Sequence, residues 1–297
     1  MKKILDNFID YLVNNKKMKL NTVNSYKRDI QSFFSYIGDE FVSADKLGEH
    51  FFSYIDNLKK MGRTASTVSR NIASLRSFFK YLLSENIISS EPTQKLKYEK
   101  KDTAEVEYKN LLTTDEIDRL ISVTKTDDLK GYRDCAIIET LYACGLKASE
   151  LLNIKISDLH FSNGYITINS GKETRYAPIY SGARKSINEY LQMSRKYLLS
   201  KNKTDLLFLN RDGMPLTRQG LWKLLKAYGK KAGINKEITP HLFRQSMAMH
   251  LVENGANIND VKELLGHKSI SLTMNYIKNF KPEIVSVYEK IHPKADK

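Results

Sequence analysis

The segment from residue 240 to residue 276 reads PHLFRQSMAMHLVENGANINDVKELLGHKSISLTMNY, and its pattern decides the fold. The proline at its start is expected to begin a helix, on which His241 and Arg244 lie three residues apart and therefore on one side. A second amphipathic helix should end at the glycine before His267, and Tyr276 follows nine residues later. Each residue alone says little, because most single histidines and tyrosines have structural roles. Their order and spacing together are far more specific than any one of these residues.

The charge balance of the chain favours a polyanionic partner. Its 297 residues include 48 Lys and Arg against 34 Asp and Glu, a formal charge of +14, which suits nucleic acid or an anionic membrane surface. The chain has no apolar run of about 18 residues, and its first residues lead into an amphipathic pattern instead of a signal peptide. We therefore expect a cytoplasmic protein without a membrane partner, and the length favours two domains.

The motifs of commoner active sites are missing from the sequence. Cys135 and Cys144 form no CxxC pair and are expected to be buried, reduced thiols. There is no HExxH or GxSxG motif. Lys172 follows a glycine, as in a phosphate-binding loop, but Ile166 stands where that loop needs glycine and Glu173 where it needs Ser or Thr. We therefore expect no cofactor and no metal.

The first 90 residues are predicted to form a helical domain. Apolar residues recur there at helical spacing in two stretches, 23–37 and 68–82. From residue 88 to residue 111 this spacing lapses, Pro92 interrupts it, and charged residues gather. The predicted organisation is a helical domain 1–90, a connector 91–110, a second domain 111–280 and a tail 281–297.

Basic residues accompany the apolar positions of the second helical stretch. They are Arg63, Arg70, Arg76 and Lys80, and hydroxyl side chains lie among them. Such residues can donate hydrogen bonds to phosphate oxygens, which makes this side a candidate DNA-binding face. A solvated basic surface is the alternative.

The second domain has a mixed helical and strand pattern. Thr113 or Thr114, followed by two acidic residues, is typical of a helix N-terminus. Residues 164–168 and 176–179 are short β-type runs around Lys172, which indicates a hairpin with a lysine at its turn. The remainder, from 221 to 276, is helical in pattern. The expected fold class is therefore mainly α with a small β-hairpin or sheet.

Taken together, these motifs resemble the tyrosine site-specific recombinase (phage integrase) family, and most of all its bacterial Xer subgroup. The resemblance covers nearly the whole chain and rests on five motifs. They are Gly145-Leu-Lys147-Ala-Ser-Glu-Leu151, the hairpin residue Lys172, His241 with Arg244, Leu265-Gly-His267, and Tyr276. The resemblance implies an N-terminal helical core-binding (SAM-like) domain that clamps DNA and an α+β catalytic domain.

The resemblance also implies a chemistry for the site. Tyr276 would attack a phosphodiester of duplex DNA and form a 3′-phosphotyrosyl intermediate, with His241 as the base. Lys147, Arg244 and His267 would bind the non-bridging oxygens, and Lys172 would protonate the leaving 5′ oxygen. The reaction needs neither ATP nor metal, because the energy of the broken bond is kept in the phosphotyrosine.

The family further implies an assembly of four protomers, a homo- or hetero-tetramer on two DNA sites, which exchanges strands in two steps through a Holliday junction. The tail carries an apolar stripe, Ile284, Val287, Tyr288 and Ile291, at helical spacing. In the family such a tail docks in the neighbouring subunit, and packing onto its own domain is the alternative. Chromosome-dimer resolution, which serves chromosome partition and cell division, and DNA integration of mobile elements both remain open.

One position departs from the family pattern, since Lys147 stands where the family has its first catalytic arginine. Lysine lacks the planar fork with which arginine holds a phosphate. The sequence admits a naturally tuned enzyme, a deliberate substitution that slows cleavage, or a non-catalytic DNA-binding paralogue. A type IB topoisomerase is a further alternative, which the N-terminal helical segment and the tail disfavour.

Overall fold

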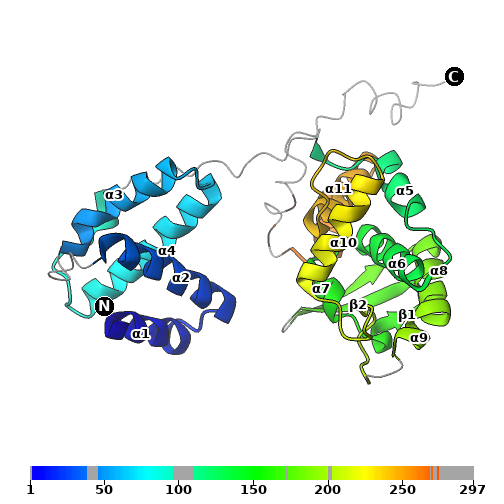
Figure 1. Cartoon of the computed structure of the whole chain (residues 1–297), viewed down its shortest axis with the longest axis horizontal. Coiled ribbons are helices and arrows are strands. Elements are labelled where there is room, and N and C mark those ends of the chain that lie inside the picture. The colour runs from blue at the N-terminus through cyan, green and yellow to red at the C-terminus, as the bar shows by residue number, and fades with distance from the viewer. Residues whose placement is uncertain are drawn as a thin grey trace. The chain divides into compact units, whose positions relative to one another are not determined.

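The computed structural model describes residues 2–38, 46–95, 110–170, 173–199, 203–267, 269 and 273. The chain divides into two compact units, Met1–Lys100 and Lys101–Lys297, and each is described by itself (Figure 1). Both units are built mainly from helices, with one small sheet in the second. None of the helices in the described ranges is long and apolar enough to cross a membrane.

The first unit is a bundle of four helices around an aromatic core. The helices are α1 (Lys2–Asp10), which continues into a π-helical turn (Tyr11–Asn15), α2 (Leu20–Ile37), α3 (Leu47–Lys60) and α4 (Ala65–Ser84). The rings at its centre are fully buried: Phe8, Phe33, Phe51, Phe78 and Phe79. Several of them meet edge to face, the arrangement that aromatic rings favour. The two helices predicted over 23–37 and 68–82 are confirmed as α2 and α4.

The beginning of the expected connector packs onto this bundle. Ile88 is buried in the core of the first unit, and Pro92–Lys95 forms a 3₁₀ turn that contacts α3 and α4. Thr93 is buried, and a Cβ atom on Gly48 of α3 would come within 2.4 Å of the Pro92 ring. The proline that interrupts the helical pattern is therefore a packing residue of the bundle, and the rest of the expected connector, 96–109, lies outside the described residues.

The second unit surrounds a central buried helix. Its helices are α5 (Thr114–Ser122), α6 (Leu129–Cys144), α7 (Ala148–Asn153), α8 (Ser181–Tyr190), α9 (Lys196–Leu198), α10 (Arg218–Lys231), α11 (Pro240–Glu253) and α12 (Ile258–Leu265), with shorter turns at Ile156–Asp158 and Leu191–Arg195. Helix α6 is buried along most of its length and packs against α5, α8 and α11. Its buried residues are mostly apolar but include Arg133 and Asp134, which pair with each other at 2.7 Å.

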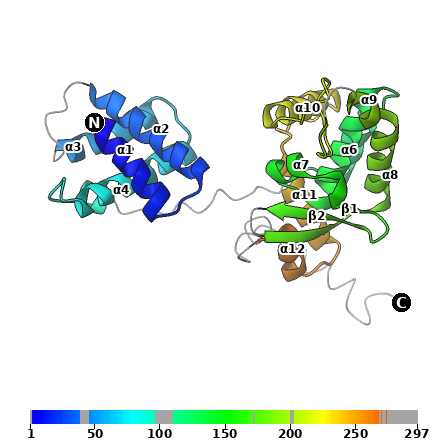
Figure 2. The same cartoon turned by 90° about the horizontal axis from the view of Figure 1, so that it is seen from below.

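The sheet of the second unit has three antiparallel strands in the order β1 (Leu159–His160), β2 (Tyr165–Ser170) and β3 (Glu173–Pro178). Strands β2 and β3 pair from Tyr165 opposite Pro178 to Ser170 opposite Glu173, which confirms the predicted hairpin. Strand β1 was not predicted, because two residues are too few to show an alternating pattern. Helix α12 lies against β3 (Figure 2).

Two further local predictions are confirmed in this unit. Thr113 caps α5 in a capping box, in which its hydroxyl accepts the Glu116 N–H and the Glu116 carboxylate accepts the Thr113 N–H. Cys135 and Cys144 are buried free thiols. Burial raises the pKa of Cys144 to about 12, so this thiol stays protonated at neutral pH and packs as an apolar side chain.

Candidate active site

The first motif forms a tight connection between α6 and α7. Gly145 ends α6 with a φ of 54°, a left-handed conformation that glycine adopts without strain. A Cβ atom there would lie 3.0 Å from Leu265 and 3.1 Å from Met247, so a larger residue would push on both α11 and α12. The chain then turns at the buried Leu146 and presents Lys147 directly before α7.

Arg244 ties three of the motifs together from within the protein. Helix α11 begins at Pro240, as the sequence predicts, and Arg244 lies one turn into it with 1% of its area exposed. Its Nη1 donates to the carbonyl of Gly145 at 2.6 Å, and its Nη2 donates to the carbonyl of Leu265. One guanidinium therefore fixes the end of α6 and the end of α12 relative to α11.

His267 follows the end of α12 and is uncharged at neutral pH. Gly266 ends the helix with a φ of 62°, and the Nδ1 atom of His267 lies 2.8 Å from the hydroxyl of Thr273. Burial, followed by the nearby cations Arg244 and Lys147, lowers the pKa of His267 to about 4. The imidazole is therefore a neutral hydrogen-bonding group at neutral pH, not a third cation.

Glu150 is a site residue that the sequence did not reveal, although it lies within the first motif. It is 4% exposed, and its Oε2 accepts the Lys147 N–H at 2.9 Å and the Arg175 Nη2 at 2.9 Å. The Lys147 ammonium lies 3.5 Å from its Oε1, and Arg244 Nη1 lies 3.9 Å from its Oε2. Burial alone would raise the pKa of Glu150, but the Lys147 N–H and the cations together lower it. One buried carboxylate thus holds three cations beside each other.

These residues border a pocket of about 350 Å³. Lys147 and His267 line it from α7 and from the end of α12, and Arg175 lines it from β3. Ser170 and Thr174, on either side of the hairpin turn, close its border. Arg244 lies behind this lining, with its terminal nitrogens on the two carbonyls. The lining contains two cationic side chains, one neutral imidazole and two carboxylates, Glu150 and Glu263. The Lys147 ammonium and the His267 imidazole can donate hydrogen bonds to a phosphate group.

The remaining predicted site residues divide into two groups. His241 lies one turn before Arg244 at an exposed position of α11, and partial burial together with Arg244 lowers its pKa, so it is a neutral imidazole able to accept a proton. Lys172 and Tyr276 lie outside the described residues. Within the described ranges, no cluster of His, Cys, Asp and Glu is suited to a metal ion.

Comparison with known protein families shows to which family this chain belongs. The model of the phage integrase family matches residues 110–283, and that of the phage integrase N-terminal SAM-like domain matches residues 5–86. The chain belongs to the phage integrase family. This family comprises the tyrosine recombinases, so the enzyme class is that of the DNA recombinases, and the fold is that of its two domains.

Similar proteins share the full length of the chain. Tyrosine recombinase XerD of Listeria innocua is 38% identical over 99% of this chain and 100% of its own, and XerD of Oceanobacillus iheyensis is 37% identical over 98% of both. Among solved structures, XerH site-specific recombinase bound to palindromic difH substrate covers 92% of this chain and 81% of its own, with a TM-score of 0.70 and 22% identity. A lambda integrase dimer bound to a core site covers 93% and 94%, with a TM-score of 0.74 and 16% identity. The two solved structures show the shared integrase fold.

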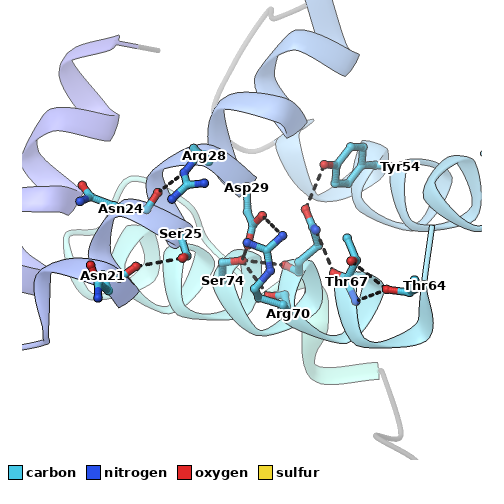
Figure 3. A network of polar contacts seen from close by, with 11 residues as sticks. Asn21, Asn24, Ser25, Arg28, Asp29, Tyr54, Thr64, Thr67, Arg70 and Ser74 are labelled. Atoms are coloured by element: carbon cyan, nitrogen blue, oxygen red, sulfur yellow. Dashed lines mark hydrogen bonds and ion pairs between the residues drawn. The ribbon is translucent and has the colours of Figure 1, made fainter. Parts of the chain in front are cut away.

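The predicted DNA-binding residues of the SAM-like domain have different surroundings. Arg63 lies before α4 and not within it, since Thr64 caps that helix. Lys80 is exposed on α4, and Arg76 is partly buried there. Arg70 is half-exposed, and its Nη2 pairs with the buried Asp29 of α2 at 3.0 Å (Figure 3). Arg70 therefore has a structural partner as well as an exposed edge.

The Arg70 pair belongs to a polar network that joins α2, α3 and α4. The Ser74 hydroxyl donates to the second oxygen of Asp29 at 2.8 Å, and the Tyr54 hydroxyl donates to Asn71 at 3.1 Å (Figure 3). Burial raises the pKa of Asp29, although Ser74 and Arg70 oppose that shift. A carboxylate buried in this way needs its cation, because an unpaired buried charge is costly.

Arg70→Met is therefore expected to lower the free energy of unfolding of the SAM-like domain by about 1–2 kcal/mol, less than for a fully buried pair because Arg70 is half-exposed. Lys80→Met, on the same helix, is the control and should leave this free energy within about 0.5 kcal/mol. Urea unfolding followed by circular dichroism measures the effect. The fluorescence of Trp222, the single tryptophan, reports the integrase unit separately and should not change. Equal stability of both variants would refute a structural role for Arg70.

Proposed function

We propose that this chain is a site-specific DNA recombinase that cuts and rejoins duplex DNA through a 3′-phosphotyrosyl intermediate. The observation that carries the proposal is this pocket, in which Arg244 and Glu150 bring together residues of separate motifs. Preassembled donors stabilise developing charge without a cost of reorganisation at the moment of reaction. The neutral state of His267 fits this function, because a neutral imidazole can still donate a hydrogen bond to a phosphate oxygen.

The reaction begins with attack of the Tyr276 oxygen on the scissile phosphorus. His241, a neutral imidazole, takes the proton of the phenol, whose ordinary pKa of about 10 would otherwise keep it protonated. Lys147, His267 and Arg244 bind the non-bridging oxygens. The bond from phosphorus to the 5′ oxygen breaks, Lys172 protonates that oxygen, and a 3′-phosphotyrosine remains. A 5′ hydroxyl of the partner strand then reverses these steps, so neither ATP nor a metal is consumed.

We propose an assembly that fits this recombinase function. The domain division is 1–90 for DNA clamping, 91–110 as linker, 111–280 for catalysis and 281–297 as a tail that docks in a neighbouring protomer. Four protomers, identical or of two kinds, would hold two recombination sites in the cytoplasm and exchange strands in two steps through a Holliday junction. The similarity to XerD recombinases over nearly the full chain supports the recombinase function. Chromosome-dimer resolution, with chromosome partition and cell division, and mobile-element integration are both compatible with this assembly.

A nicked suicide substrate tests this function, because loss of a short cleaved fragment traps the covalent intermediate. The expected result is a protein–DNA adduct that survives denaturation. The alternative is a non-catalytic or impaired DNA-binding paralogue, which Lys147 alone favours. That alternative predicts DNA binding with no adduct, even when Lys147 is changed to arginine.

Lys172→Ala is expected to slow cleavage of ordinary DNA by about 10²- to 10⁴-fold, the usual contribution of a general acid. Cleavage of DNA with sulfur in place of the leaving 5′ oxygen should change far less, because a thiolate leaves without protonation. Lys185→Ala, an exposed lysine on α8, is the control and should match the parent on both substrates. If Lys172→Ala is equally slow on both, Lys172 is not the general acid.

A further inference from the structure

Arg175 is a partly buried arginine that lines the pocket and has no role in the proposed chemistry. It lies on β3, three residues after Lys172, and 13% of its side chain is exposed. Its Nη2 donates to Glu150 of α7 at 2.9 Å, and its Nη1 donates to the carbonyl of Leu264 in α12 at 2.5 Å. One side chain of the hairpin thus reaches two elements that are far apart in the sequence.

The aliphatic part of Arg175 also lies across the turn that ends α12. A Cβ atom on Gly266 would come within 2.9 Å of Arg175 Cδ and 3.5 Å of its Nε. The Nε atom is buried. The two terminal nitrogens are fixed by their acceptors, and the aliphatic part of the side chain packs against Gly266. The glycine before His267 is therefore needed both for its positive φ and for the passage of Arg175.

We propose that Arg175 is a positioning residue that holds the Glu150 carboxylate and the end of α12 in place, so that Lys147 and His267 face the same phosphate. The inference rests on the proposed function and deepens it. The contacts that matter in this role are those of its terminal nitrogens with Glu150 and Leu264. It acts through the two groups that it orients.

Arginine suits this role and lysine does not. The planar guanidinium donates from two nitrogens in a fixed geometry, whereas a lysine ammonium is a single point on a flexible stem. Lysine at position 175 would keep the positive charge but could not bridge Glu150 and Leu264 in the same geometry. Arg175→Lys therefore separates the effect of position from the effect of charge.

The charges around His267 allow a test without DNA. Burial, Arg244, Lys147, Arg175 and His241 all contribute to its lowered pKa, and Glu263 also borders the pocket. If Arg175 acted through charge alone, Arg175→Lys would leave the imidazole signals of His267 unchanged. If it acts through position, the same variant will shift the ¹⁵N signals and the pKa of that imidazole.

Single-turnover cleavage of the nicked substrate by the full chain is the functional test. Arg175→Lys is expected to slow cleavage by about 10- to 100-fold, the scale of a misplacement of about 1 Å. DNA affinity should change by less than about threefold, since it depends on many phosphate contacts. Arg184→Lys is the matched control, because Arg184 donates to a backbone carbonyl, that of Phe161, away from the pocket. The control should match the parent in cleavage and in the His267 signals.

A double-mutant cycle identifies the route of action. Arg175→Met and Glu150→Gln both break the contact between these two residues, so together they should slow cleavage by less than the product of their separate effects. Multiplicative effects, or Arg175→Lys with parental cleavage, would overturn the positioning role. If the parent forms no adduct, the proposed function fails, and the His267 signals of Arg175→Lys still decide the inference: a shift supports it and parental signals overturn it. If Arg175→Met does not fold, the lysine variant alone carries the test.

Discussion

Replacing Lys147 by arginine is expected to raise the rate of DNA cleavage by about ten- to a thousandfold, the scale of one transition-state donor. The Lys147 ammonium lies 3.5 Å from Glu150 and is half-exposed at the edge of the pocket. An arginine there could keep Glu150 on one edge of its fork and donate to a phosphate oxygen from the other. DNA affinity should barely change, because this side chain acts at one phosphate whose charge grows during the reaction.

Single-turnover cleavage of a nicked substrate at saturating protein measures this effect, with filter binding as the control for affinity. An unchanged rate together with rapid cleavage by the parent would mean that the pocket has adapted to lysine, as in a naturally tuned enzyme. No cleavage by either form would favour the non-catalytic paralogue. A large gain would indicate a site built for arginine, whether the lysine arose naturally or by deliberate substitution.

Tyr276→Phe is expected to abolish the covalent adduct and to leave DNA affinity unchanged. The variant keeps the aromatic ring and removes only the oxygen that attacks the phosphorus. Denaturing gel electrophoresis after incubation with the nicked substrate detects the adduct, and a gel-shift assay measures binding. Tyr197→Phe, an exposed tyrosine on α9, is the control and should form as much adduct as the parent. An adduct in Tyr276→Phe would rule out Tyr276 as the nucleophile.

Local sequence patterns predicted most of the fold. Helix α4, the capping box at Thr113 and the β2–β3 hairpin each depend on residues close together in the chain, and each is confirmed. The two-residue strand β1 has no periodicity to detect. The role of Pro92 was missed for another reason, since a break in helical pattern shows where a helix ends but not where the next residues pack.

The side-chain partners of the site could not be predicted in the same way. Arg244 contacts Gly145, 99 residues away, and Arg175 contacts Leu264, 89 residues away. The sequence identified Arg244 by its motif, but the motif did not show that the guanidinium is buried. Glu150 and Arg175 were missed as site residues, because a glutamate in a first helical turn and an arginine in a strand have many other uses.

The sequence pattern also failed to show the partner of Arg70. A basic residue between the apolar positions of a helix suggests an exposed surface, and the pattern alone favours a DNA contact. The ion pair with Asp29, 41 positions earlier in the sequence, becomes visible only when α2 packs on α4. Lys172 and Tyr276 stay predictions from their motifs, since both lie outside the described residues.

Identification of the residue that is bonded to DNA tests the central claim most directly. The adduct formed on the nicked substrate is digested with trypsin and nuclease, and the peptide that carries a nucleotide is sequenced by mass spectrometry. The expected peptide is 269–278, SISLTMNYIK, which contains one tyrosine. A nucleotide phosphate on Tyr276 is the predicted result. A nucleotide on any other residue, or the absence of an adduct from both the parent and Lys147→Arg, would contradict the account.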